Sequence, residues 1–372
     1  MIISHLNVGF RVRDLFRKQN DRWSRPAWGI PTSSWGGTVA LYLGLIAGCL
    51  PGRAYAWQFP ATEAATQSLY QQIKTDYEAR PVWSNGWINR SRNGVNSPYV
   101  DSSDWMSGTH AEIVPDEVIS VIPEAQFLSY SLFSQAVRGM RAILANFPSA
   151  GIRNELLTIV DFDQKTEGRR FYVLNLKTGR MLFQTWAQHG SNSDEDRDRL
   201  PELFSNINGS FQSSLGFVLT SETPYNGSFG YSLRMHGIDE NLNSLVHSRA
   251  IVFHPWPTMH PRGVAQLDAG NTSLGCIALP YYESGRFYGM ADQPLSRLIV
   301  DTIKGRSVVF VSSSTVNLNQ ASAYLTGTGK LSAATRDRIL KRITREGATR
   351  MLMDAEAPEV PQEYRDWLGR RD

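Results

Sequence analysis

The chain has 372 residues, 20% of them charged and 11% aromatic, and its formal net charge is +3. Residues 1–56 hold seven Lys or Arg against two Asp and so carry +5, which leaves −2 for the rest of the chain. A nucleic-acid-binding protein needs a basic face or stripe, so this balance excludes a nucleic-acid partner. The length suits two domains, or one β-rich domain with helical additions.

The first 56 residues have the order of an export signal. Six basic side chains precede an apolar run over residues 39–50, and Ala54-Tyr55-Ala56 follows that run. A basic, then apolar, then small-x-small order is typical of a secretory signal. The run has 12 residues, whereas a bilayer-spanning helix needs about 20. We therefore predict that residues 1–56 direct export to the periplasm or cell envelope, with a buried helix as the alternative.

A second processing site overlaps the first. The segment Leu45-Ile46-Ala47-Gly48-Cys49 resembles the bacterial lipobox, in which the cysteine becomes the lipidated first residue. Alternatively, Cys49 is one more small apolar residue of the run. Lipidation at Cys49 and cleavage after Ala56 both stay open. A membrane contact is expected only through such a lipid anchor or through an uncleaved signal.

Residues 57–128 are expected to form an N-terminal segment of helix and loop. Leu69, Ile73 and Tyr77 recur every four residues before Pro81, which predicts a short amphipathic helix. Four aromatic residues within 83–108 lie among Ser, Asn, Gly and Arg without a helix or strand period. We interpret this stretch as an ordered loop whose rings either clamp it onto the domain or stack on sugars, and we assign no site there.

A longer helix and many short strands are expected within residues 129–312. An apolar stripe at 132, 133, 136, 137, 140 and 144 predicts the helix, which should end at Pro148 and Gly151. The period then changes to two. Turn residues such as Asn226-Gly227 separate the expected strands at 157–162, 170–176, 180–186, 216–220, 232–235, 250–254, 276–279 and 307–311. The pattern predicts a mainly β fold with flanking helices, built on a short-stranded antiparallel sheet or sandwich.

Residues 313–372 return to a charged, helical pattern. Ile339 and Ile343 are four residues apart among basic side chains, which predicts a solvated helix packed on the body. A basic helix of this kind also suits a membrane surface, although Asp337 and Glu346 dilute its charge. The solvated helical tail is the preferred interpretation.

Cys276 is the residue on which the predicted chemistry depends. If the leader with Cys49 is removed, Cys276 has no intramolecular partner, and a disulfide framework needs an even number of cysteines. A thiol has a pKa near 8.5 and needs a base or a cation beside it to act as a nucleophile. Of the seven His, His254 ends the apolar run 250–253 and precedes Cys276 by 22 residues. We therefore expect a Cys276–His254 pair.

Six segments along residues 130–312 follow one another in a consistent order. They are LTIVDF (157–162), FYVLNLKTG (171–179), HGS (189–191), YNGSFGYSLR (225–234), RAIVFH (249–254) and SLGC (273–276). Together they resemble the YkuD-type L,D-transpeptidase catalytic domains, and in more detail their murein L,D-transpeptidase branch. Two positions depart from the pattern: Pro255 stands where the branch usually has Gly, and Ala278 where the wider family usually has Arg. Proline lacks an N–H and restricts His254 to extended backbone.

The resemblance implies an exported cysteine acyltransferase that modifies peptidoglycan. Cys276 would form a thioester with a cell-wall stem peptide, with His254 as general base and then acid. The amides of Gly275 and Cys276 would be oxyanion donors, and Ser273 would orient the imidazole, bind substrate or serve only as a turn residue. The acyl group would pass to a second stem peptide, to a protein amine or to water. Carbapenems, which acylate the cysteine of this family, should form an adduct.

A polar strand segment is expected to supply the substrate-binding residues. Tyr231, Ser232, Arg234 and His236 would face the cleft, where Arg234 suits a substrate carboxylate; a structural ion pair is the alternative. His189 would line the same site or be structural.

No metal or other cofactor is expected. His254, His260 and Asp268 lie close in sequence but lack the ligand spacing of a catalytic zinc site. Two other classes of function stay open. One is a different exported cysteine hydrolase, such as an L,D-carboxypeptidase, endopeptidase or amidase. The other is a non-catalytic wall-binding protein that kept the fold.

Overall fold

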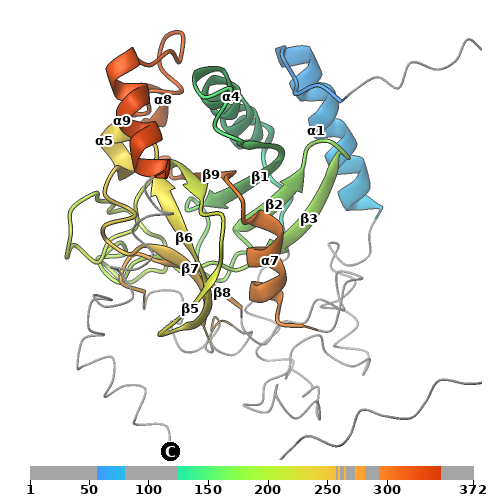
Figure 1. Ribbon diagram of the computed structural model, residues 1–372. Helices are drawn as coiled ribbons and strands as arrows, with labels where there is room; N and C mark the ends of the chain where they lie inside the picture. The colour runs from blue at the N-terminus through green and yellow to red at the C-terminus, as the bar shows by residue number, and fades with distance from the viewer. Residues whose placement is uncertain are drawn as a thin grey trace, which may run out of the picture. The chain divides into compact units, whose positions relative to one another are not determined.

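The computed structural model describes residues 57–79, 125–256, 259, 264, 273–280 and 293–344 (Figure 1). Contacts divide the chain into Met1–Tyr55 and Ala56–Asp372, and every described residue belongs to the second unit. The predicted export signal with Cys49, the aromatic stretch 83–108 and the end of the tail after residue 344 lie outside the described residues. Within the described part, no helix has the length and hydropathy needed to cross a membrane.

Among residues 57–79 and 125–152, two helices precede the sheet, as the sequence predicts. Helix α1 (Glu63–Glu78) begins at Thr62, whose hydroxyl accepts the N–H of Ala65 at 3.2 Å. Helix α4 (Tyr130–Asn146) begins at Ser129 in the same way; such caps satisfy backbone donors that have no partner inside the helix. The two helices contact each other, and the buried face of α4 packs on strands β1 and β9.

One sheet of nine strands forms the body. Its spatial order is β3 (Arg180–Thr185), β2 (Phe171–Asn175), β1 (Arg153–Asp161), β9 (Ser307–Ser312), β4 (Gly216–Thr220), β6 (Gly230–Gly237), β7 (Val252–Trp256) and β8 (Ile277–Pro280), with β5 (Tyr225–Gly227) paired to β6. The pairs β1–β9 and β7–β8 are parallel, and the other described pairs are antiparallel. The predicted mainly β fold with flanking helices is confirmed, as one continuous sheet.

The sheet curls until its two ends nearly meet. Gln188, just after β3, donates its N–H to the carbonyl of Ala278 in β8 at 3.0 Å. Gly190 forms an isolated parallel bridge with Ser273, the residue that opens the SLGC segment. The nearly closed, barrel-like sheet therefore brings residues 189–191 beside the expected nucleophile, although the two segments are far apart in the chain.

In the described part of the chain, four further helices with assigned bounds lie after the first strands. Helix α7 (Leu295–Ile303) packs on β6, β7 and β8. Helices α5 (Glu240–Asn243) and α8 (Leu318–Ala321) are short. Helix α9 (Ala333–Thr344) is the predicted tail helix: Ile339 and Ile343 are buried, and Arg342 donates to the carbonyl of Gly237 at 2.6 Å.

Two local predictions differ from the structure. Asn226 and Gly227 belong to β5, because Gly227 pairs with Gly230 and the two-residue turn lies between them. Strand β7 also continues beyond His254, through Pro255 to Trp256. β6 pairs with β7 only at Val252 and Phe253 of the described residues, so a residue without an N–H is tolerated further along the strand, as at a sheet edge.

Candidate active site

Cys276 and His254 lie on adjacent parallel strands. The register pairs Phe253 with Ile277 and His254 with Ala278, so Cys276, which directly precedes β8, falls level with Val252. Residues two apart in a strand share a face. The thiol and the imidazole therefore emerge on the same face, with Cys276 8% exposed and His254 3% exposed.

The imidazole of His254 is oriented by the main chain. Its Nδ1 lies 2.9 Å from the carbonyl oxygen of Pro255. Because a carbonyl oxygen only accepts, Nδ1 carries the proton and Nε2 is left as the basic nitrogen. A base oriented by a third group is the usual arrangement for activating a nucleophile. Pro255 supplies that group through its backbone, a role that residue type does not reveal.

The thiol and the imidazole are both neutral at pH 7. Burial lowers the pKa of His254 to about 4, against the opposing effect of the Pro255 hydrogen bond. Burial also raises the pKa of Cys276 to about 11, against the opposing effects of a Val252 backbone contact and the Arg249 charge. The thiol donates weakly to the carbonyl of Ala250, with Sγ 3.7 Å from the oxygen. The neutral imidazole is the form that accepts a proton.

Ser273 shapes the turn that carries Cys276. Its oxygen lies 2.8 Å from the carbonyl oxygens of both His189 and Cys276, which share its single proton, and it accepts the N–H of Gly275 at 3.2 Å. Gly275 has φ +107°, and a Cβ there would lie 2.7 Å from the carbonyl oxygen of Gln212. The Ser273 hydroxyl is thus engaged with backbone rather than with the imidazole, and the Gly275 amide is engaged with Ser273.

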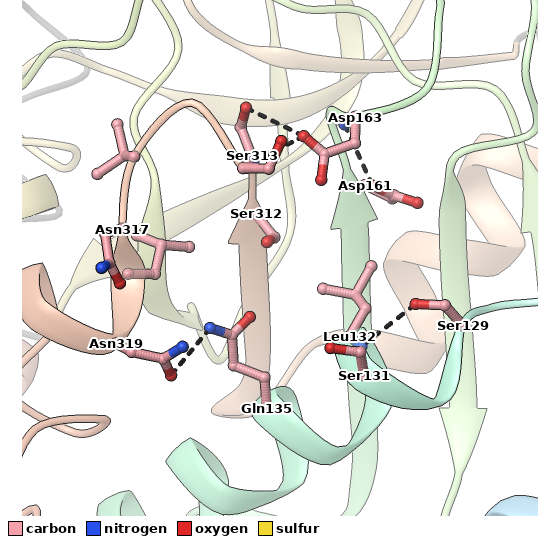
Figure 2. A pocket seen from close by; sticks show the side chains of 13 residues that line it. Ser129, Ser131, Leu132, Gln135, Asp161, Asp163, Ser312, Ser313, Asn317 and Asn319 are labelled. Atoms are coloured by element: carbon pink, nitrogen blue, oxygen red, sulfur yellow. Dashed lines mark hydrogen bonds between the residues drawn. The ribbon is translucent and has the colours of Figure 1, made fainter.

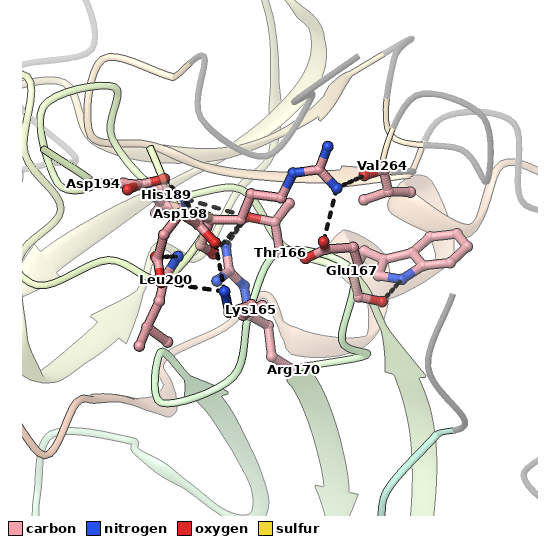
Figure 3. A network of polar contacts seen from close by, with 11 residues as sticks. Lys165, Thr166, Glu167, Arg170, His189, Asp194, Asp198, Leu200 and Val264 are labelled. Carbon is pink, nitrogen blue, oxygen red and sulfur yellow. Dashed lines mark hydrogen bonds and ion pairs between the residues drawn. The ribbon is translucent and has the colours of Figure 1, made fainter. Parts of the chain in front are cut away.

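His189 reaches this turn only through its backbone. Its side chain is fully buried, with Nε2 3.3 Å from the Thr166 hydroxyl, in the polar network that Figure 3 shows. Burial, together with the charge of Arg170, holds its pKa well below the ordinary value. Its carbonyl accepts the hydrogen bond from Ser273. The ring of His189 is part of the network that supports the site.

The polar residues of β6 divide between two faces of the sheet. The register places Arg234 opposite Val252, and Ser232 lies two residues before Arg234 in β6, so both lie on the face of the Cys–His pair. Arg234 stacks over the ring of Tyr225, 4.5 Å from its centroid. Tyr231 lies on the opposite face, where its hydroxyl donates to Asp301 of α7 at 2.8 Å.

His236 lies further along the face of Ser232 and Arg234. It is buried, and its ring stacks on that of His247 with 5.1 Å between centroids. The structure thus brings Ser232 and Arg234 to the pair, and places Tyr231 against α7.

A comparison with protein families agrees with this geometry. The model for the L,D-transpeptidase catalytic domain matches residues 124–312. The chain belongs to the L,D-transpeptidase catalytic domain family. The family and the fold expected from the sequence are confirmed.

Two solved structures are similar to the chain. One is a variant of the helical cell shape determining protein Pgp2 from Campylobacter jejuni, with 13% identity, a TM-score of 0.26, and coverage of 47% of this chain and 56% of that one. The other is an L,D-transpeptidase from Mycobacterium tuberculosis, with 16% identity, a TM-score of 0.21, and coverage of 43% and 58%. The chain therefore spans little more than half the length of each. Curated proteins give no match.

Two aromatic rings cover the imidazole of His254 in this L,D-transpeptidase domain. Phe229, in the turn between β5 and β6, stacks on His254 with 4.7 Å between ring centroids and 29° between planes. Trp256 packs edge-on against both rings, at 5.5 Å from Phe229 and 5.9 Å from His254. Phe229 was not predicted as a site residue; its place within the YNGSFGYSLR segment was the sequence feature that could have pointed to it.

Two other polar features lie outside the Cys–His pair of the L,D-transpeptidase domain. Oxygen atoms of Asp194, Asp196, Asp198 and Glu202 lie within 4.8 Å of one another. Among the described residues, these four side chains are close enough together to hold a cation. Exposed acidic groups also cluster in proteins where no cation is bound, so no metal site is assigned here.

The second feature is a cavity of about 530 Å³ between the start of α4 and the ends of β1 and β9 (Figure 2). Asp161, Asp163, Ser313 and Asn319 are among the residues that line it, whereas Cys276 and His254 do not.

Proposed function

We propose that the protein is an exported cysteine acyltransferase that modifies peptidoglycan, with Cys276 as nucleophile and His254 as base. The observation that carries the proposal is the placement of these two residues on one face of the parallel pair β7–β8, with the Nδ1 proton of His254 held by Pro255. Membership of the L,D-transpeptidase family supports peptidoglycan as the substrate. Export is proposed from the order of basic, apolar and small residues in 1–56.

The reaction follows from the protonation states of the pair. Sγ of Cys276 attacks the carbonyl carbon of a stem-peptide bond while its proton passes to Nε2 of His254. The tetrahedral intermediate collapses to a thioester, and the leaving amine takes the proton from Nε2. An acceptor amine or water then attacks the thioester and gives a proton to His254, which returns it to the departing thiolate of Cys276.

Acylation by a carbapenem tests the nucleophile and the base. The full-length protein is incubated with the drug, and its intact mass is measured beside the Cys276→Ala and His254→Ala variants. Ring opening adds the whole mass of the drug, because no group leaves. We expect one adduct in the wild type, none in Cys276→Ala and slower formation in His254→Ala. Analysis of digested sacculi then separates transpeptidation from carboxypeptidase or endopeptidase activity.

A non-catalytic wall-binding role is the second candidate. The observation in its favour is that Cys276 and His254 are almost fully buried and both neutral. It predicts binding to sacculi that survives Cys276→Ala and no acyl-enzyme in any variant. An absent adduct on a folded protein whose Cys276 still reacts with iodoacetamide would favour this role or a different cysteine hydrolase.

A further inference from the structure

Arg249 is a half-buried cation that bonds only neutral oxygen atoms among the described residues. Its Nη1 donates to the carbonyl of Ser205 at 2.7 Å and to the hydroxyl of Ser214 at 2.6 Å. Its Nη2 donates to the carbonyl of Gln212 at 2.7 Å and to the hydroxyl of Ser210 at 3.1 Å. Four bonds from both ends of the guanidinium hold it in one orientation, yet among the described residues none of these partners is a carboxylate.

The guanidinium lies against the turn that carries the nucleophile. A Cβ on Gly275 would be 3.3 Å from Nη2 of Arg249 and 2.7 Å from the Gln212 carbonyl that Nη2 bonds. The next residue, Ala250, accepts the weak hydrogen bond of the Cys276 thiol through its carbonyl. The fixed cation is therefore a neighbour of the backbone that directly precedes Cys276.

A partly buried charge without a counter-ion is unfavourable, and a nearby group of opposite charge relieves it. Burial lowers the pKa of Arg249, and the charge of Cys276 in its ionised form opposes this effect. The same interaction lowers the pKa of Cys276. Among the described residues, the counter-ion that fits Arg249 is thus the Cys276 thiolate, which exists only once the proton has left Sγ.

We propose that Arg249 is a positioning residue that supplies the counter-charge for the Cys276 thiolate. The inference rests on the proposed function only in taking Cys276 as the nucleophile. When Nε2 of His254 takes the thiol proton, the negative charge forms beside a cation that is already fixed. No side chain has to move to meet it, which lowers the free energy of the ion pair relative to the neutral pair.

The alternative is that Arg249 has only a structural role and holds residues 205–214 against the segment before β7. Variants that separate its charge from its hydrogen bonds distinguish this role from the proposed one. Arg249→Gln removes the charge and keeps an amide donor, whereas Arg249→Lys keeps the charge and loses the fork. Ser210→Asp replaces the hydroxyl that Nη2 bonds with a carboxylate, and Ser210→Asn has the same shape without charge.

The measurement is the pH dependence of iodoacetamide alkylation of Cys276 in the full-length protein. The Cys276→Ala variant gives the background from Cys49, and thermal unfolding verifies that each variant is folded. We expect Arg249→Gln to lower the alkylation rate at pH 8 about tenfold, equivalent to one unit of thiol pKa. Ser210→Asp should shift the midpoint in the same direction, while Ser210→Asn and Arg249→Lys should leave it close to the wild type.

The proposal is overturned if Ser210→Asp and Ser210→Asn have the same midpoint, or if Arg249→Lys shifts it as far as Arg249→Gln. Ser210 variants keep the test valid even where Arg249→Gln does not fold. Alkylation needs no peptidoglycan and no carbapenem, so failure of this inference is distinct from failure of the proposed activity.

Discussion

The ring of Phe229 lies over the imidazole of His254, with 4.7 Å between the two centroids. This apolar cover contributes to the burial that lowers the pKa of His254 to about 4. Phe229→Ala admits water and reduces the cost of the imidazolium. We therefore expect the pKa of His254 to rise toward its ordinary value near 6.5, as measured by NMR titration of the imidazole. Phe229→Leu keeps an apolar cover and should change the pKa less; equal pKa values in all three proteins would contradict the prediction.

Ser273→Ala tests the backbone role of a residue expected to assist catalysis. The hydroxyl bonds two carbonyls and one amide of the turn, so its loss should destabilise the protein by about 1–3 kcal/mol and slow alkylation of Cys276. The pKa of His254 should stay unchanged, because the hydroxyl does not contact the imidazole in the described structure. Ser191→Ala is the control, since Ser191 contacts Ser273 only by its N–H, at 2.7 Å. A shifted His254 titration in Ser273→Ala would show a direct link.

Gly139→Ala should destabilise the protein although alanine is the better helix former. A Cβ at Gly139 in α4 would lie 2.0 Å from Cζ of Phe217 in β4. Overpacking of this kind costs about 1–3 kcal/mol, which exceeds the helix-propensity gain of about 1 kcal/mol. Urea unfolding measures the difference. In a Phe217→Leu background the cost of Gly139→Ala should fall, and an equal cost in both backgrounds would show that Phe217 is not the obstacle.

Asp239 should make the protein less stable as pH rises through the mildly acidic range. It is fully buried, and burial raises its pKa to about 6, compared with about 3.9 in the unfolded chain. Between these two pKa values the folded state therefore binds more protons than the unfolded state. The stabilisation that protonated Asp239 contributes below pH 4 is lost as pH rises to about 6. Asp239→Asn should remove this part of the pH dependence and raise stability at pH 7 by about 1–2 kcal/mol.

The control for Asp239 is Asp337→Asn, which changes the same charge on an exposed position of α9. Chemical unfolding at pH 4, 5, 6 and 7 compares the three proteins. A wild type and an Asp239→Asn variant with parallel pH profiles would contradict the prediction.

Much of the fold could be predicted from the periodic spacing of apolar residues in the sequence. The period-two runs predict eight of the nine strands, and the stripes at Leu69 and Phe133 predict α1 and α4. The missed strand, β5, is only three residues long, which is too short to show an alternating pattern of apolar residues. The parallel pairing of β7 with β8 could not be predicted, because pairing direction depends on the path of the chain between strands rather than on the strand sequences.

The sequence points to Cys276 and His254 as the candidate pair but not to the contacts that hold them. Cys276 and His254 can be recognised by their residue types and by the segments RAIVFH and SLGC that contain them. The contacts that fix them use the carbonyls of Pro255, His189 and Ala250, and every residue type carries a carbonyl. The placement of Tyr231 had a sequence signal, since it is adjacent to Ser232 and neighbours in a strand point to opposite faces.

Gly275 directly precedes Cys276, and Pro255 directly follows His254. The two positions should differ in how many residue types they tolerate. Each single-nucleotide change that replaces a glycine codon's amino acid adds a Cβ or stops translation. At Gly275 that carbon meets the Gln212 carbonyl at 2.7 Å on a backbone with φ +107°, so a saturation library should retain one functional residue there. Pro255 contacts the imidazole of His254 through its carbonyl, so the same library should tolerate many residues at position 255.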